Sequence, residues 1–217
     1  MTVSRTRIKF CGIRRPRDRD AAVALGVDAI GLILVPASPR FVDLERAAAL
    51  RAGVPPFVSS VALFKDPDAG FVIEAIDALK PDLLQFHGSE AEGFCESFGL
   101  PYLKAVAMGG KVSLPRAARD YASAAALLLD SHAPGGMGGR GETFVWKQPP
   151  AVKKAWVLAG GLSPENVAKG ITLMRPFAVD VSSGIEARPG VKDPDKMRAF
   201  VAAVQRADRR LNRIENQ

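Results

Sequence analysis

The chain alternates short apolar runs with longer stretches in which apolar residues recur at helical spacing. The short runs recur about every 24 residues, a spacing that suits one strand followed by one helix. Most of them are apolar at nearly every position, as is typical of parallel strands that are buried on both faces. We predict eight strands, at Ile8 to Cys11, Ala29 to Leu34, Val58 to Phe64, Leu83 to His87, Tyr102 to Met108, Ala126 to Asp130, Trp156 to Ala159 and Ala178 to Val181.

Amphipathic stretches lie between these strands and close the chain. Asp68, Ser89 and Ser163 are predicted to be N-caps, and Pro164 stands at an expected first helical position. The last helix carries apolar residues at helical spacing between Met197 and Val204. The predicted helices include Asp18 to Leu25, Leu44 to Arg51, Ala69 to Leu79, Glu90 to Phe98, Arg116 to Tyr121, Pro164 to Gly170 and Asp193 to Leu211.

Eight strand-helix units in 217 residues predict an α/β protein with a single (β/α)8 barrel domain over residues 1–217. The alternative is an open doubly wound sheet, which is expected to carry a glycine-rich dinucleotide turn after its first strand. The residues that follow Cys11 are Gly-Ile-Arg-Arg-Pro, which do not match that turn. We therefore favour the closed barrel.

Composition and charge limit the classes of function. No run approaches the roughly 18 apolar residues of a membrane span, and no apolar signal segment follows Met1, so we expect a cytoplasmic protein that does not bind membranes. Two cysteines and two histidines are too few and too scattered for a closed zinc site or a disulfide framework, so we expect no metal. The net charge of +7 is dispersed, apart from a denser segment at Arg206 to Arg213. It fits an anionic small molecule better than nucleic acid.

In a barrel of this kind the functional residues follow the strands. The candidate cleft therefore contains a thiol at Cys11, an acid at Asp130, a cation at Arg40 and two loops of small residues. Gly160 and Gly161 follow the seventh strand, and Ser183 and Gly184 follow the eighth; loops at these positions often hold a phosphate with backbone N–H groups. The alternative is that both loops are merely tight turns.

Several segments in this order resemble one known family, the phosphoribosylanthranilate isomerases of tryptophan biosynthesis. They span nearly the whole chain, so the combined signal is strong although each segment alone is weak. The segments are Lys9 to Ile13 (KFCGI), Ser38 to Val42 (SPRFV), Leu84 to Gly88 (LQFHG), Leu128 to Ser131 (LLDS), Leu158 to Val167 (LAGGLSPENV), Val179 to Glu186 (VDVSSGIE) and Pro189 to Asp193 (PGVKD).

The resemblance implies an Amadori rearrangement of N-(5-phosphoribosyl)anthranilate that needs no cofactor. It implies Asp130 as the general acid that protonates the ring oxygen, and Cys11 as the general base that removes the proton from the sugar C2. Near neutral pH an unperturbed carboxyl is ionised and an unperturbed thiol is protonated. Both groups therefore need help from the fold, and we expect cationic or helix-N-terminal surroundings to lower the pKa of the thiol.

Three further residues are candidates for the site. Arg40 suits the anthranilate carboxylate because a guanidinium meets a carboxylate with two donors in a fixed fork, although an arginine in a loop is more often simply solvated. His87 either lines the cleft or caps the fourth strand, and we assign it no proton transfer. Asp180 is given a supporting role that shapes the cleft or orients a neighbour.

The chain departs from the family pattern after the sixth strand. Arg140 stands where the family has a small hydroxyl residue, Val145 replaces an aspartate, and the glycine-rich segment 134–141 is longer than usual. These differences concern substrate gating and affinity more than the reaction. Two other functions stay open: a histidine-pathway sugar-phosphate isomerase, which is expected to carry an aspartate in place of Cys11, and a non-catalytic barrel that binds a phosphorylated ligand. The sequence leaves open whether the protein is a monomer or a homodimer.

Overall fold

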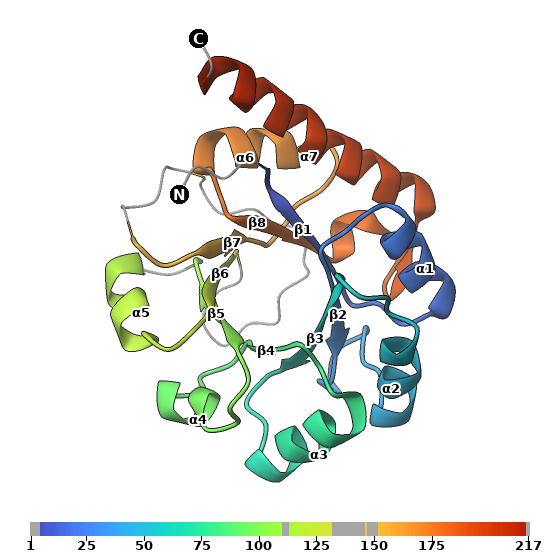
Figure 1. Ribbon diagram of the computed structural model, residues 1–217, viewed down its shortest axis with the longest axis vertical. Helices are drawn as coiled ribbons and strands as arrows, with labels where there is room; N and C mark the ends of the chain where they lie inside the picture. Colours follow the sequence, from blue (N-terminus) through green and yellow to red (C-terminus); the bar gives the residue numbers. More distant parts are fainter. Residues whose placement is uncertain (1–4, 110–112, 132–145, 147–151, 216–217) are drawn as a thin grey trace.

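Eight parallel strands stand side by side in chain order and close into a barrel (Figure 1). The computed structural model describes residues 5–109, 113–131, 146 and 152–215. Closure is made by β1, which pairs with β2 on one side and with β8 on the other. The strands are β1 (Arg7–Cys11), β2 (Ala29–Ile33), β3 (Ser59–Phe64), β4 (Leu83–Phe86), β5 (Tyr102–Ala107), β6 (Ala126–Asp130), β7 (Trp156–Leu158) and β8 (Ala178–Val181).

Helices surround the barrel on the outside, as Figure 1 shows. The helices are α1 (Pro16–Ala24), α2 (Leu44–Ala52), α3 (Ala69–Leu79), α4 (Glu92–Glu96), α5 (Leu114–Asp120), α6 (Val167–Met174) and α7 (Pro194–Glu215), with a 3-10 turn η1 (Ser183–Ile185) after β8. The predicted (β/α)8 fold is thus confirmed. A short antiparallel pair that the sequence pattern did not predict, β9 (Glu186–Arg188) and β10 (Val191–Lys192), follows η1.

Side-chain alternation on β1 shows how the sequence builds both layers. Phe10 points outward and meets Phe200 of α7 edge to face, with 6.0 Å between the ring centroids. Successive residues of a strand face opposite sides, so Lys9 and Cys11 point into the barrel. Both are buried. One strand therefore supplies an aromatic contact to the helical layer and two polar groups to the interior.

Helix starts follow local capping in some places and tertiary contacts in others. Asp68 caps α3 as predicted, because its side chain accepts a hydrogen bond from Phe71 N. The predicted caps at Ser89 and Ser163 are wrong. Helix α4 begins two residues later than expected, after Ala91, since the Glu90 side chain is drawn inward to a buried lysine. Helix α6 begins at Val167, after a turn that Asn166 closes.

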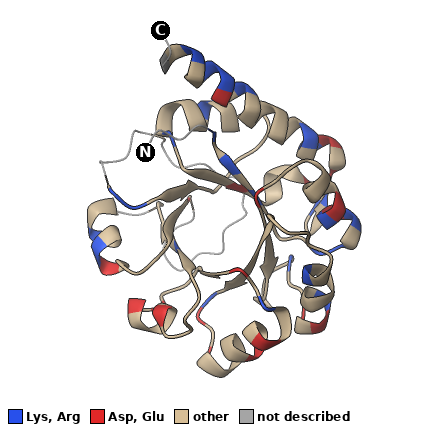
Figure 2. Cartoon of the chain, in the orientation of Figure 1, with Lys and Arg blue, Asp and Glu red and all other residues tan. Residues whose placement is uncertain are grey.

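The denser basic segment lies on the outer surface of the barrel wall. Arg206, Arg209, Arg210 and Arg213 are exposed residues of α7 (Figure 2). Their side chains share the solvent face of a helix whose opposite face packs on α6 and α1. In the described part of the chain, no helix is both long enough and apolar enough to cross a bilayer.

Candidate active site

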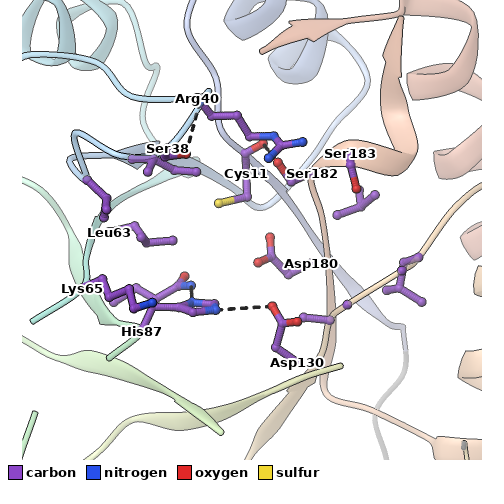
Figure 3. Close-up of a pocket in the computed structure, with 18 residues that line it drawn as sticks. Cys11, Ser38, Arg40, Leu63, Lys65, His87, Asp130, Asp180, Ser182 and Ser183 are labelled. Atoms are coloured by element: carbon purple, nitrogen blue, oxygen red, sulfur yellow. Dashed lines mark hydrogen bonds and ion pairs between the residues drawn. The ribbon is translucent and has the colours of Figure 1, made fainter. Parts of the chain in front are cut away.

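A pocket opens at the carboxyl ends of the strands, where the family of barrel enzymes holds its chemistry (Figure 3). Its wall combines polar groups with apolar side chains from β2 and β3. The lining residues are Cys11, Ile33, Val35, Ser38, Arg40, Leu63, Lys65, Gln85, His87, Asp130, Ala159, Gly160, Gly161, Leu162, Asp180, Val181, Ser182 and Ser183. These residues come from distant parts of the sequence, so only the closed barrel brings them together.

Cys11 ends β1 with its sulfur beside an apolar wall. The side chain packs with Ile33 and Leu63 and is only 4% exposed. Burial raises the pKa of the thiol above its ordinary value, while the ammonium groups of Lys9 and Lys192 act in the opposite direction. The expectation of a lowered thiol pKa is therefore wrong for the protein without substrate. Desolvation of the thiolate outweighs the two cations.

Asp130 ends β6 on the opposite side of the pocket, next to His87. His87 Nε2 lies 3.4 Å from Asp130 Oδ2, and the two side chains face each other in Figure 3. On the other side of the ring, Gln85 Nε2 lies 3.2 Å from His87 Nδ1. Gln85 is buried and comes from the same strand end as His87. The carboxyl group is thus backed by a histidine whose ring is held by an amide.

Arg40 reaches the pocket from the loop after β2, held by an acidic partner. Its Nε and Nη2 atoms each donate to Glu186, at 2.8 Å to Oε1 and 2.8 Å to Oε2. Lys192 Nζ donates to the same carboxylate at 3.0 Å and to Ser182 O at 3.0 Å. Burial acts to raise the pKa of Glu186, but the contacts with Arg40 and Lys192 outweigh it and the pKa is lowered.

The fork that we expected to meet a substrate carboxylate is therefore partly occupied. A guanidinium has five N–H donors, and Glu186 takes two of them along the Nε and Nη2 edge. The other edge of the guanidinium, formed by Nη1 and Nη2, has donors that Glu186 does not use and that a second carboxylate could accept from. Arg40 lines the pocket and is buried, so its side chain is fixed before any ligand arrives.

The two small-residue loops lie together at the rim. Gly160 and Gly161 both have positive φ, at 76° and 66°, a conformation that glycine adopts without strain. Asn166 holds the first loop, accepting from Ser163 N and donating to Gly161 O, each at 2.8 Å. Gly160, Gly161 and Ser183 line the pocket. Gly184 stands outside the lining, and a Cβ there would collide with Leu162 O. Because Gly184 has no side chain, the backbone after β8 can pack closely against the backbone of the loop after β7.

A family model described as N-(5'-phosphoribosyl)anthranilate isomerase matches residues 8–203. This match covers most of the chain, including every pocket residue named above. The chain belongs to the N-(5'-phosphoribosyl)anthranilate isomerase family.

Sequence relatives and solved structures agree with this isomerase family. The isomerase of Halorhodospira halophila is 50% identical over 204 residues, covering 94% of this chain and 99% of the relative. The isomerase of Stenotrophomonas maltophilia strain R551-3 is also 50% identical, over 207 residues, with 94% and 95% covered. The solved isomerase of Thermotoga maritima has a TM-score of 0.81 at 34% identity, with 92% of this chain and 98% of that chain covered.

One solved isomerase was crystallised in complex with reduced 1-(o-carboxyphenylamino)-1-deoxyribulose 5-phosphate. It has a TM-score of 0.79 and 32% identity to this chain, and the match covers 92% of this chain and 98% of that one. The ligand carries a carboxylate at one end and a phosphate at the other. In this family, therefore, at least one barrel binds a molecule of that kind.

Sequence reasoning found most of the pocket of this isomerase but missed its buried charges. The structure brings Cys11, Asp130, Arg40, His87 and Asp180 to one cavity, as expected. The missed charges are Lys9, Glu186 and Lys192, which are buried next to the pocket, and Lys65, which lines it; the buried amide of Gln85 also lines it. Alternation on β1 was the available signal for Lys9, since it shares a face with Cys11. Segment 134–141, with Arg140, and also Val145 lie outside the described residues.

Proposed function

We propose that this chain catalyses the isomerisation of N-(5'-phosphoribosyl)anthranilate to 1-(2-carboxyphenylamino)-1-deoxyribulose 5-phosphate, a step of tryptophan biosynthesis, without a cofactor. Family membership supports the reaction. The observation that supports the residue roles most strongly is that Cys11 and Asp130 line one pocket from different strand ends. A substrate seated between them has a base on one side and an acid on the other.

The reaction needs two proton movements. In our proposal Asp130 in its protonated form gives a proton to the furanose ring oxygen, the C1–O bond breaks, and a Schiff base forms. Cys11 as thiolate then takes the proton from the sugar C2, and the resulting enolamine tautomerises to the ketose. His87, 3.4 Å from Asp130, holds the carboxyl group in place. Asp180 keeps the supporting role at the floor of the pocket.

Turnover of the purified protein tests this function. The anthranilate-type fluorescence of the phosphoribosyl conjugate should decrease after the purified protein is added, and this loss should not occur when the protein is omitted. A histidine-pathway substrate should be turned over far more slowly. Phosphate-ligand binding with no loss of fluorescence would instead support a non-catalytic barrel and would overturn the proposal.

Inorganic phosphate should compete with the substrate. The loops with Gly160, Gly161 and Ser183, closed by Gly184, are suited to hold the sugar phosphate with backbone donors. We expect phosphate and sulfate to raise KM without changing kcat, and chloride at the same ionic strength to have little effect. A crystal grown in sulfate should hold the anion between the loops. Anions bound only to surface arginines would contradict the assignment.

Arg40→Ala should weaken substrate binding by about 1.5 to 3 kcal/mol, which is roughly 10-fold to 150-fold in KM. The lost contact is the one between the free edge of the guanidinium and the anthranilate carboxylate. Arg40→Lys should recover only part of the loss, because an ammonium has no fork and pairs less well with Glu186.

A substrate analogue without the carboxylate is the control for Arg40. Its KM should hardly respond to Arg40→Ala. Equal losses for both substrates would mean that Arg40 acts through the shape of the pocket, by way of Glu186, and would contradict carboxylate recognition.

Assembly and location remain predictions. One solved structure shows monomers generated from the dimeric isomerase of Thermotoga maritima. That structure is 29% identical to this chain, with a TM-score of 0.77. We propose that this chain works in the cytoplasm as a monomer or a homodimer, which sedimentation of the purified protein would decide.

A further inference from the structure

Lys9 lies directly beneath the pocket floor, although the mechanism above does not use it. It stands two residues before Cys11 on β1, so both side chains face the interior of the barrel. In the pairing of β1 with β8, Lys9 is in register with Asp180. Its Nζ atom donates to Asp180 Oδ1 at 3.0 Å, with the two side chains 6% and 8% exposed. A buried ammonium is therefore fixed one layer below the thiol.

Gly31 on the neighbouring strand shows how close the ammonium comes to the sulfur. Cys11 pairs with Gly31 across β1 and β2. A Cβ added at Gly31 would stand 2.7 Å from Cys11 Sγ and 3.1 Å from Lys9 Nζ. Both atoms thus lie against the same point of the glycine, and the missing side chain leaves room for the two groups to meet.

The charges around the sulfur come from several elements. Lys9 is on the same strand, Asp180 is on β8, Lys192 is on β10, and Arg40 lies in the loop after β2. Burial would lower the pKa of Lys9, but Asp180 and Cys11 outweigh it and the pKa is raised, so Lys9 is an ammonium. Lys192 donates to Glu186 at 3.0 Å, and burial lowers its pKa. Lys9 is therefore the cation whose remaining donors best suit a thiolate.

We propose that Lys9 is a positioning residue that holds the Cys11 thiolate in place and is shared between that thiolate and the Asp180 carboxylate. The proposal deepens the proposed function, because it rests on Cys11 as the base. When the thiol loses its proton to solvent, a negative charge appears in a buried site. Lys9 supplies a counter-charge already in position, since Asp180 has fixed its side chain. Asp180 in turn competes with the thiolate for the same ammonium.

Thiolate absorbance in the ultraviolet, followed against pH without substrate, tests this arrangement. Subtracting the titration of Cys11→Ser isolates the signal of Cys11 from that of Cys95. Lys9→Met keeps the length of the side chain and removes the charge, so the thiolate fraction at a fixed pH should fall about tenfold or more. Asp180→Asn should change it in the opposite direction, because the ammonium is then available to the sulfur alone.

Lys104→Met is the matched control. Lys104 is another buried lysine of the barrel wall, on the side of β5 that faces the helices, paired with Glu90 and donating to Gly88 O at 2.6 Å. Its loss should leave the Cys11 titration unchanged. If Lys9→Met does not fold, the double variant Lys9→Met with Asp180→Asn removes both buried charges together. Its thiolate fraction should be lower than that of Asp180→Asn alone.

A Cys11 titration that is the same in Lys9→Met and in the parent protein would overturn the proposal, as would a fall in the thiolate fraction of Asp180→Asn. Activity adds a second readout, since Lys9→Met should lower kcat about tenfold or more while KM changes little. Because the titration needs no substrate, its outcome is independent of the turnover assay. If the parent protein does not turn over the substrate but Lys9→Met still shifts the Cys11 titration, the proposed function is refuted while the role of Lys9 beside the thiolate stands.

Discussion

Cys11→Ser is expected to lower kcat by about 10²-fold to 10⁴-fold, the usual contribution of a general base. Serine keeps the size of the side chain, but a hydroxyl gives up its proton far less readily than a thiol, so almost no base is present near neutral pH. KM should stay close to that of the parent, because the loops with Gly160, Gly161 and Ser183 are untouched. Steady-state kinetics of the purified variant give both constants.

Cys95→Ala is the control for this substitution. Cys95 is the other thiol of the chain, buried in α4, and its pKa is raised to about 11 by burial. It does not line the pocket, so kcat should be retained. A substrate deuterated at the sugar C2 should slow the parent enzyme where proton abstraction limits the rate. Turnover of Cys11→Ser near the parent value, with a deuterium effect still present, would assign the base to another group.

Strand number and order could be predicted because burial on both faces leaves a plain pattern of apolar runs. Each predicted strand is present, with its ends changed by one residue at most. Helix ends were less predictable. Glu90 was expected to begin α4, but it accepts from Gly88 N and Asp66 N and pairs with Lys104. Asp66 and Lys104 are distant from Glu90 in the sequence, so no local pattern indicates these two contacts.

The candidate site divides in the same way. Residues at strand ends, such as Cys11 and Asp130, follow from the rule that barrel enzymes place their chemistry there. The pair of Arg40 and Glu186 joins positions 146 residues apart, and its geometry depends on the β9 and β10 hairpin. The raised pKa of Cys11 was missed for a similar reason. It results from a balance between burial and nearby charges that only the packed structure reveals.

The raised pKa of Cys11 determines how activity should depend on pH. A carboxyl group ordinarily gives up its proton several pH units below a thiol. The reactive pair, a thiolate with a carboxylic acid, therefore has the same net charge as a thiol with a carboxylate. The ratio of the two forms does not change with pH, so turnover of the parent should be nearly flat from about pH 6 to about pH 8. If the rate falls outside that range, the apparent pKa values of the profile belong to Cys11 and Asp130 as a coupled pair.

Asp130→Asn should lower kcat by about 10²-fold to 10⁴-fold, since an amide has no acidic proton to give to the ring oxygen. Phosphate competition should be unchanged, because the substitution leaves the loops after β7 and β8 intact. The remaining activity should lose its flat profile. Only the thiolate now needs to form, and below the pKa of Cys11 its fraction rises tenfold with each pH unit.

The direction of the slope follows from the environment of the thiol. Burial keeps the pKa of Cys11 above its ordinary value, so the rise in residual activity should continue through neutral pH into the alkaline range. Rates of Asp130→Asn measured across that range against the flat parent profile decide the matter. A residual rate as flat as that of the parent would mean that His87, which faces the carboxylate at 3.4 Å, or another group still supplies the proton. The assignment of Asp130 as the acid would then be wrong.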